Sequence, residues 1–464
     1  MAYSVKDSPF SIVKCLSNCF LLTIYQTIWR WKFWRHTIRD ESSEFKGPFP
    51  VHIVIVGGGP AGIFAAIRVA ETGSQNRVTV LEATHEPLDK VRISGGGRCN
   101  VTHNCFDPVE LVKHYPRGHK ELRGPFSFFQ PRDIVEFFMR HGVKLKSEPD
   151  GRMFPVTDSS QTIIDCLLSV AKSLGVEIRL GNRVKTITVT SDGNSSRFII
   201  GLHNDESIAA DRVMIASGSS PQGYRLAESV GHTIVPCVPS LFTFKVKDER
   251  LKDLSGISFS RVRLKLDTGG NKKLSQTGPL LITHWGLSGP AVLKLSAWGA
   301  RTLNECRYKA KLTVNFLPEH DIKSVYNDFL LHKKKNPKKR VVSQPLFDIP
   351  KRYWTRATAA AGIIDTLLWA NISKAALTAL AQQLTTATFL VTGKGIFKEE
   401  FVTAGGVNLK EVDFRTMQSR ICPGLYFGGE VLDIDGVTGG FNFQSSWTTG
   451  WIAGGSMGAT SVKK

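Results

Sequence analysis

The 464-residue chain lacks the cysteine patterns that define several classes of protein. Its eight cysteines, at positions 15, 19, 99, 105, 166, 237, 306 and 422, include no CxxC pair. This absence argues against a disulfide framework, a zinc site and a dithiol redox centre, so no metal site is predicted. Hydrophobic residues make up 42% and charged residues 22%, which argues against a disordered chain and a polytopic membrane protein.

The N-terminal apolar stretch is too short to cross a membrane. Fifteen uncharged residues separate Lys14 from Arg30, whereas a spanning helix needs about 20 apolar residues. The first 39 residues carry six basic residues and one acid. We expect residues 1–50 to be an extension outside the fold: a presequence for a mitochondrion or plastid, an interfacial membrane anchor, or an incidental extension of a cytoplasmic protein.

Acidic residues are scarce relative to basic ones. Sixty Lys and Arg against forty Asp and Glu give a net charge of +20, which attracts nucleic acid, anionic lipid or phosphate-bearing cofactors. Six of these charges lie in the acid-free run 333–340. Because no aromatic residue interleaves the run and Pro337 interrupts it, we expect a solvated loop between helices rather than a site for single-stranded nucleic acid.

A dinucleotide-binding fingerprint follows the first predicted strand. Residues 51–56 form a short apolar run typical of a strand buried in a parallel sheet. The next six residues, GGGPAG, fill the pattern GxGxxG with Gly57, Gly59 and Gly62, and a helix is predicted over 63–70. Gly57 permits the tight turn, Gly59 lets a pyrophosphate approach the backbone, and Gly62 lets the helix pack on the strand.

The same fingerprint predicts further contacts to the dinucleotide. Pro60 and Ala61 lie in the glycine turn before the helix, whose N-terminal N–H groups and positive dipole end attract phosphate. A second strand over 77–81 ends at Glu82, where a carboxylate can accept hydrogen bonds from both hydroxyls of an adenosine ribose. NAD and FAD share that adenosine half, so the motif alone leaves the choice between them open.

Two further glycine-rich stretches lie outside the fingerprint. Residues 93–102, ISGGGRCNVT, form a predicted loop whose N–H groups and Arg98 suit phosphate or flavin oxygens. In residues 424–442 a predicted strand ends in Gly-Gly-Glu, a glycine loop follows, and a helix begins near Asn442. An apolar strand over 212–216 also runs into small residues.

Four blocks of this sequence resemble the BaiN-like (YhiN, aminoacetone oxidase-like) group of FAD-dependent oxidoreductases. They are SGGGRCNVTH, THWGLSGPAVL, TAGGV and GLYFGGEVLDIDGVTGGFNFQSSWTTGWIAGG, in the family's order, and the resemblance covers about residues 51–458. It implies an α/β, Rossmann-like FAD-binding fold, FAD as the cofactor and an oxidoreductase activity. It leaves the substrate open, because relatives reduce carbon–carbon double bonds of steroid-like acids or oxidise small amines.

The resemblance also implies roles for individual residues. Ser94 to Asn100 would line the flavin, Val184 would bring its backbone to the adenine, and Glu430 would contact the ribityl chain or the pyrophosphate. The helix from Asn442 would direct its N-terminus at the flavin and stabilise the reduced anion. The predicted cofactor contacts are Gly57, Gly59, Pro60, Ala61, Gly62, Glu82, Ser94, Gly95, Gly96, Gly97, Arg98, Cys99, Asn100, Val184, Gly218, Gly429, Glu430, Asp435, Gly439, Gly440 and Asn442.

Cofactor blocks near both ends predict a discontinuous FAD-binding domain. We expect it to comprise residues 51–225 and 386–464, with an inserted substrate or cap domain over 226–385. The inserted part should begin with antiparallel strands and continue with helices. The patterns that indicate this are alternation at 241–246 and 261–266 and helical patches at 366–370 and 375–384.

The reaction is less defined than the cofactor. No second GxGxxG follows a strand, so we expect no separate NAD(P)H domain, and NAD(P)H would act as a transient reductant. Candidate catalytic residues are Arg98, Cys99, Asn100 and His284. The alternative role of Cys99 is packing, and the alternative role of His284 is a structural hydrogen bond.

We therefore expect an FAD-dependent oxidoreductase that exchanges hydride with a small organic molecule. Two alternatives stay open: a flavoprotein that acts on or binds nucleic acid, as tRNA-modifying flavoenzymes do, and a non-catalytic flavin-binding protein. A nucleic-acid partner is not the expected one, because only the net charge supports it. A membrane contact is expected only through the N-terminal extension, and the sequence does not indicate an oligomeric state.

Overall fold

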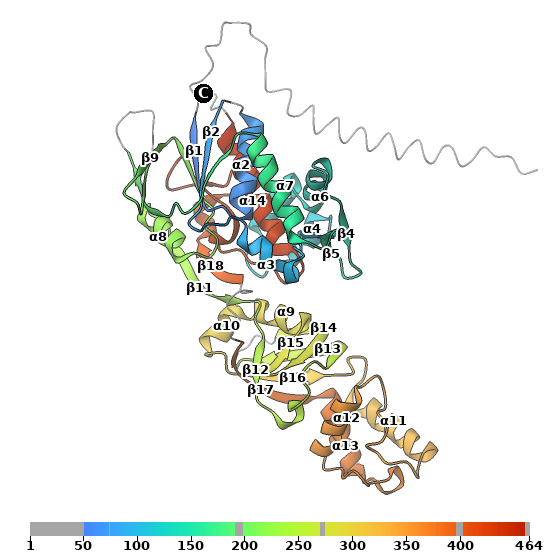
Figure 1. Ribbon diagram of the computed structural model, residues 1–464. Coiled ribbons are helices and arrows are strands. Elements are labelled where there is room, and N and C mark those ends of the chain that lie inside the picture. Colours follow the sequence, from blue (N-terminus) through green and yellow to red (C-terminus); the bar gives the residue numbers. More distant parts are fainter. Residues whose placement is uncertain (1–50, 74, 191–197, 270–273, 396–401, 460–464) are drawn as a thin grey trace, which may run out of the picture. The chain divides into compact units, whose positions relative to one another are not determined.

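The computed structural model describes residues 51–73, 75–190, 198–269, 274–395 and 402–459. Its main sheet has seven strands in the order β19-β20-β21-β10-β1-β2-β6 (Figure 1). Strands β21, β10, β1, β2 and β6 run parallel, whereas β19 and β20 are antiparallel additions at one edge. The strands are β1 His52–Val56, β2 Arg77–Leu81, β6 Glu177–Arg179, β10 Arg212–Ile215, β19 Val412–Asp413, β20 Gln418–Ser419 and β21 Leu425–Phe427.

The predicted strands at 51–56, 77–81 and 212–216 are confirmed within one residue at each end. Strand β1 lies between β10 and β2, and Ile53 to Val56 are buried. A strand with neighbours on both edges whose side chains are buried in both directions needs apolar residues throughout, which explains its continuous hydrophobic run. The α/β Rossmann-like fold class is confirmed.

The helices α2 (Pro60–Thr72) and α14 (Phe441–Gly458) pack closely against each other beside this sheet (Figure 1). Glycines on one face of α14 make the close approach possible. A Cβ at Gly450 would lie 2.5 Å from the carbonyl oxygen of Ala61, and one at Gly454 would lie 2.5 Å from that of Ala65. The last helix of the chain is thereby fixed to the first helix of the fingerprint.

The remaining elements of this part surround the sheet. Two small antiparallel sheets, β3-β5-β4 and β7-β8-β9, and several helices complete it. The strands are β3 Thr102–His103, β4 Leu145–Ser147, β5 Arg152–Pro155, β7 Val184–Val189, β8 Phe198–Leu202 and β9 Ser207–Ala210. The helices are α3 Asp89–Gly97, α4 Pro108–Leu111, α5 Pro125–Phe128, α6 Pro131–Arg140, α7 Ser160–Ser173 and α8 Pro221–Ser229.

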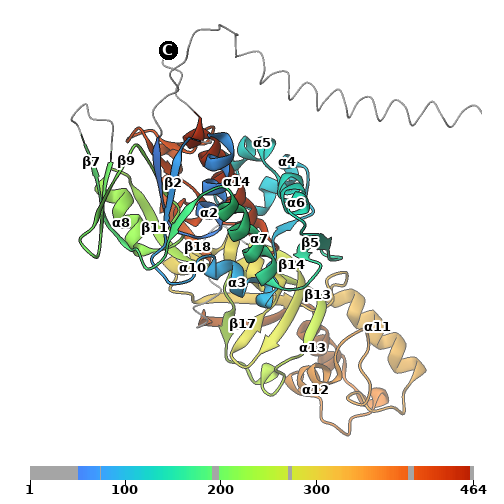
Figure 2. The same ribbon diagram turned by 45° about the horizontal axis from the view of Figure 1, so that its top comes forward.

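The inserted segment contains a closed barrel, with its own hydrophobic core, in the order β12-β15-β14-β13-β16-β17. Helices α11, α12 and α13 lie together at one end of it (Figure 2). The strands are β12 Phe244–Val246, β13 Ser258–Asp267, β14 Leu274–Thr283, β15 Gly286–Ser288, β16 Ala310–Asn315 and β17 Ala387–Lys394. The helices are α9 Pro290–Trp298, α10 Ala300–Glu305, α11 Ile322–Lys335, α12 Lys351–Ala360 and α13 Lys374–Thr385.

The segment enters the barrel after β11 (Ile234–Ser240) and leaves it before β18 (Val402–Val407), and these two strands pair antiparallel. Strand β17 belongs to the barrel, so the structure places residues 387–394 there and not in the second FAD-binding stretch. Both parts belong to one compact unit, Pro50–Lys464.

Two local predictions in the inserted segment need correction. The helix over 375–384 is confirmed by α13, but residues 366–370 form turns that lead into a single 3-10 turn, Trp369–Asn371. The basic run is only partly a loop, because its first three lysines form the last turn of α11. Cations at that end of a helix are favoured by the helix dipole, which explains the longer helix.

The predicted extension, residues 1–50, lies outside the described residues, and its role stays a prediction. Within the described ranges, no helix combines the length and the hydropathy that a membrane span needs.

The packing of α14 on α2 predicts that alanine substitutions at two glycines of α14 differ in their effect on stability. Gly450→Ala should lower the free energy of unfolding by about 1–3 kcal/mol, because the new Cβ would overlap the Ala61 carbonyl. Gly455→Ala is the matched control, since its Cβ would meet only Arg68 Nε at 3.7 Å, and it should be neutral or stabilising by up to about 1 kcal/mol. Urea unfolding measures both; equal effects would contradict the packing.

Candidate functional site

A cavity of about 940 Å³ lies where the carboxyl ends of β1, β2 and β10 meet the N-termini of α2 and α14. Val56, Leu81 and Ala216 line it at the strand ends. Ligands of doubly wound α/β folds bind at this edge of the sheet. The volume is in the range of small-molecule and cofactor sites.

Each of the three fingerprint positions holds glycine for a different structural reason. A Cβ at Gly57 would lie 2.5 Å from the Ala216 carbonyl oxygen, and one at Gly62 would lie 2.0 Å from the Gly57 carbonyl oxygen. A Cβ at Gly59 would meet no described atom within 4 Å, and its φ of −79° suits any residue. Packing therefore requires Gly57 and Gly62, whereas the space beside Gly59 is left for a ligand. Gly57 and Gly59 line the cavity and Gly62 does not.

Helix α2 presents an uncapped N-terminus to the cavity. Pro60 and Ala61 line the cavity, and no described side chain caps the helix. Its first N–H groups therefore have no side-chain acceptor among the described residues, and they carry the positive end of the helix dipole. An anionic pyrophosphate fits this position.

Glu82 is fixed at the cavity edge by three hydrogen bonds. Its Oε2 accepts from the Gly58 N–H at 2.7 Å, and its Oε1 accepts from the N–H and Oγ1 of Thr84 at 2.8 and 2.9 Å. An ionised carboxylate has about four acceptor sites, so these bonds leave capacity for a ribose hydroxyl. Glu82 lines the cavity, as a ribose ligand would require.

The glycine stretch at the end of α3, where the backbone of Ser94, Gly95 and Gly96 is not helical, lies partly at the cavity. Ser94, Gly95, Gly96 and Asn100 line it, and Gly97 does not. With its amide oriented to donate to the Thr102 carbonyl at 3.1 Å, Asn100 accepts from the Gly440 N–H at 2.9 Å. Asn100 thus joins this loop to the start of α14.

Arg98 and Cys99 do not line the cavity, contrary to the prediction from the loop sequence. Arg98 donates to Glu148 Oε1 at 2.8 Å and lies 4.0 Å from the centroid of the Phe154 ring. Cys99 is fully buried, and burial raises the pKa of its thiol to about 12. A thiol with that pKa stays protonated at neutral pH, so Cys99 packs the core and is no nucleophile.

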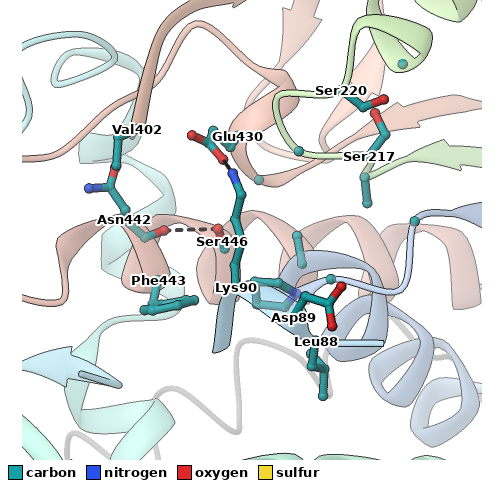
Figure 3. Close-up of a pocket in the computed structure, with 18 of the residues that line it drawn as sticks. Leu88, Asp89, Lys90, Ser217, Ser220, Val402, Glu430, Asn442, Phe443 and Ser446 are labelled. Carbon is teal, nitrogen blue, oxygen red and sulfur yellow. Dashed lines mark hydrogen bonds and ion pairs between the residues drawn. The ribbon is translucent and has the colours of Figure 1, made fainter. Parts of the chain in front are cut away.

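The C-terminal glycine block supplies the opposite wall. Gly429, Glu430, Gly439, Gly440 and Asn442 line the cavity. The Lys90 ammonium extends to Glu430 in an ion pair (Figure 3), and Glu430 Oε1 accepts from the Thr403 N–H at 3.0 Å. Helix α14 begins without a described side-chain cap, so its first N–H groups have no capping acceptor among the described side chains.

Asp435 is not a cavity residue, which corrects the prediction. It is fully buried and forms a two-pronged ion pair with Arg117. Ser240 Oγ donates to it at 2.6 Å, and Arg117 Nη1 donates to the Ala297 carbonyl at 2.8 Å. Burial raises the Asp435 pKa, whereas Arg117 and Ser240 favour the ionised form. Asp435 therefore joins the glycine block to α9 of the inserted segment.

The other predicted residues divide between the cavity and the surface. Val184 and Gly218 line the cavity. His284 lies exposed in the turn between β14 and β15, so it does not reach the cavity. Of the four catalytic candidates, only Asn100 is a cavity residue.

The sequence interpretation missed cavity residues that tertiary packing brings in. Lys90 follows Glu82 without a recognisable motif, and Leu241, Leu293 and Val402 come from the inserted segment or the strands that lead to it. The side chains of Leu241, Leu293 and Val402 form an apolar wall of the cavity. Only their alternating or helical apolar pattern was visible in the sequence, and that pattern also marks an ordinary core residue.

A stack of rings at the start of α14 was also missed. Phe441 contacts both His103 and His114, with ring centroids 4.7 and 4.2 Å away, and the two histidine rings lie 5.9 Å from each other. Burial, with His103 and Lys294 nearby, lowers the pKa of His114 to about 4. His114 is therefore neutral at pH 7 and packs against Phe441 as an uncharged ring.

These features together fit FAD. The uncapped α2 N-terminus and the open space at Gly59 would hold the pyrophosphate, and Glu82 would hold the adenosine ribose. The second uncapped N-terminus, that of α14, suits the flavin end. Within the described ranges, no group of three or more His, Cys, Asp or Glu could hold a metal ion.

The open space at Gly59 predicts a separation of binding from folding. Gly59→Ala should lower FAD affinity by about tenfold or more, because its methyl group would occupy the pyrophosphate space. The apoprotein should keep its free energy of unfolding within about 0.5 kcal/mol. Gly62→Ala should lower apoprotein stability by about 1–3 kcal/mol. FAD titration and urea unfolding distinguish the two; a destabilised Gly59→Ala apoprotein would contradict the assignment.

The burial of Cys99 predicts its chemical inertness. Iodoacetamide at neutral pH should alkylate the exposed Cys237 and leave Cys99 unmodified until the protein unfolds. Peptide mass spectrometry of native and urea-unfolded samples measures this. Alkylation of both thiols at similar rates in the native protein would mean that Cys99 is accessible.

Comparison with known proteins agrees with this geometry. Residues 51–456 match the family described as HI0933-like protein Rossmann domain. A 3-dehydro-bile acid delta(4,6)-reductase from Clostridium scindens is 30% identical over 410 residues, which cover 87% of this chain and 98% of the relative. A ribosomal RNA dihydrouridine synthase from Escherichia coli is also 30% identical over 410 residues, 86% of this chain and 96% of the relative.

Among solved structures, a 3-ketosteroid-delta4-(5alpha)-dehydrogenase from Rhodococcus jostii is 14% identical, with a TM-score of 0.49, and the match covers 91% of this chain and all of that chain. The family match over most of the chain confirms the resemblance drawn from the four sequence blocks. The chain belongs to the HI0933-like family of FAD-dependent oxidoreductases.

Proposed function

We propose that this protein is an FAD-dependent reductase that passes a hydride to a polarised carbon–carbon double bond. The observation that carries the proposal is the cavity with an uncapped helix N-terminus at each end, one for a pyrophosphate and one for the flavin. The names of two relatives support the reaction type: a delta(4,6)-reductase and a dihydrouridine synthase both saturate a ring double bond.

The chain's own residues would bind and orient the reactants. Bound FAD supplies two-electron hydride chemistry. The α14 N-terminus, held by Asn100, would stabilise negative charge at the flavin end. Leu241, Leu293 and Phe443 would exclude water from that side of the cavity. We also propose NAD(P)H as the transient reductant, since the sequence has no second fingerprint for a resident nicotinamide.

Two substrate classes satisfy this reaction. The first is a small conjugated carbonyl compound, which the apolar wall and the bile acid reductase support. The second is a uracil ring in RNA, whose 5,6 double bond is conjugated to a carbonyl. The relative named ribosomal RNA dihydrouridine synthase and the net charge of +20 favour that second candidate.

Anaerobic reoxidation of the reduced holoprotein tests the reaction type. The FAD-reconstituted protein would be reduced with NADH or NADPH and mixed with a panel of cyclic enones or with a uridine-containing transcript. We expect one class to restore the oxidised flavin spectrum, with a saturated ketone and a transcript containing dihydrouridine as matched controls. Reduced flavin that persists with both classes, in protein that holds FAD, would overturn the proposal.

A further inference from the structure

The positive charge of the chain is concentrated in the inserted segment. Residues 244–394 contain 26 Lys and Arg against 10 Asp and Glu, a net charge of +16 out of +20. The flavin-binding stretches, 51–243 and 395–464, contain 27 basic and 26 acidic residues. Exposure to solvent does not by itself require such an excess of basic residues, because the flavin-binding part of the same chain is nearly neutral.

Several of the ten acids of the inserted segment already have local partners. Arg250 pairs with Asp248 at 2.7 Å, and Arg261 pairs with Glu319 at 2.9 Å. Asp321 accepts from the Ser324 N–H at 2.7 Å at the start of α11. These interactions leave most of the lysines without a neutralising carboxylate.

One group of these cations lies on the outer face of the barrel, and we call it the basic face. It consists of Arg263 and Lys265 on β13 and Lys311 on the adjacent strand β16. Alternate residues of the same strands, such as Leu264 and Leu312, are buried in the barrel core. Lys265 and Lys311 are exposed, and Arg263 is half-buried.

The pairing register brings the cations of the basic face together. Lys265 is opposite Thr313 and Arg263 is opposite Asn315, so Lys265 and Lys311 are diagonal neighbours on adjacent strands. Asp267 faces Lys311 in the register, but its Oδ1 accepts from the Gly269 N–H at 2.9 Å. Within the described ranges, neither Lys265 nor Lys311 has a carboxylate oxygen within 4 Å of its ammonium group.

Ordinary structural roles do not account for the basic face. The lysines at the end of α11 are explained by the helix dipole, and Lys333 donates to the Ile372 carbonyl at 2.9 Å. Lysines on strands often protect an exposed sheet edge from aggregation. The described strands form a closed barrel, so Lys265 and Lys311 lie on strands that already have partners on both sides.

We propose that the basic face is a docking surface for RNA, through phosphate contacts of Arg263, Lys265 and Lys311. The proposal rests on the second substrate candidate above and adds the surface that would hold the nucleic acid. The inserted segment also supplies Leu293 to the cavity wall, so one unit would hold the RNA and form part of the site that receives its base. Phosphate contacts position a nucleic acid without reading its sequence.

Binding of a fluorescent RNA hairpin to the FAD-reconstituted protein, followed by anisotropy over a series of salt concentrations, tests the proposal. Lys265→Glu with Lys311→Glu should weaken binding by about tenfold or more and lower the salt-dependence slope by about two, one for each lost phosphate contact. Lys144→Glu with Lys172→Glu, both exposed on the flavin-binding part, is the matched control and should change binding less than about twofold. FAD content and melting temperature should stay unchanged in both variants.

Equal weakening by both variants would overturn the proposal, because only net charge would then matter. Absence of RNA binding by the unmodified protein at low salt would overturn it too, as would preferential binding to phosphatidylserine vesicles. Flavin reoxidation by a small enone is measured in the same samples. If the enone reoxidises the flavin but RNA does not bind, the docking surface fails and the reductase proposal stands. If RNA binds but no acceptor reoxidises the flavin, the reductase proposal fails and the docking surface stands.

Discussion

The close packing of α14 on α2 is the contact on which the whole cavity depends. It brings the N-terminus of a helix that starts at Pro60 and that of a helix that starts at Phe441 to the same cavity. The contact has almost no tolerance, because the backbone of α2 occupies the space where side chains at Gly450 and Gly454 would be. Two helix dipoles therefore point at one ligand from segments at opposite ends of the fold.

A second constraint ties the inserted segment to that cavity. The ion pair of Asp435 and Arg117 is buried, and it is completed by Ser240 and the carbonyl of Ala297. Removal of one partner from such a pair typically costs about 3–5 kcal/mol, because the other charge stays buried without compensation. The glycine block, the strand that leads into the insertion and helix α9 are thus held in one arrangement.

Local sequence was sufficient for the residues whose role is set by their own backbone. The strand, turn and helix around Gly57, Gly59 and Gly62 follow from apolar periodicity and from the steric demands of glycine. Arg98 and Asp435 were expected at the cofactor but do not line the cavity, and the reason is the same for both. Both lie in glycine-rich loops at the cavity, but their side chains bind partners, Glu148 and Arg117, that are distant in sequence. No local pattern indicates which way such a side chain turns.

The wall formed by the inserted segment could not be predicted for the same reason. Leu293 lies in a short apolar helix that looks like any core helix until the fold brings it to the cavity. The concentration of charge, in contrast, was present in the sequence. Only the structure gives the boundaries of the barrel, and these boundaries separate the charged segment from the near-neutral remainder of the fold.

The pairing of β11 with β18 has an evolutionary consequence. The chain leaves the sheet-bearing part at Ser240 and returns at Val402, and these two residues are register partners. Closing a loop between adjacent ends costs little entropy, whatever the length of chain between them. A lineage could therefore exchange everything between these strands for a different module while it keeps the same cofactor and the same sheet. Flavoproteins built in this way would then acquire different substrates by exchanging the segment that is inserted between these two neighbouring residues.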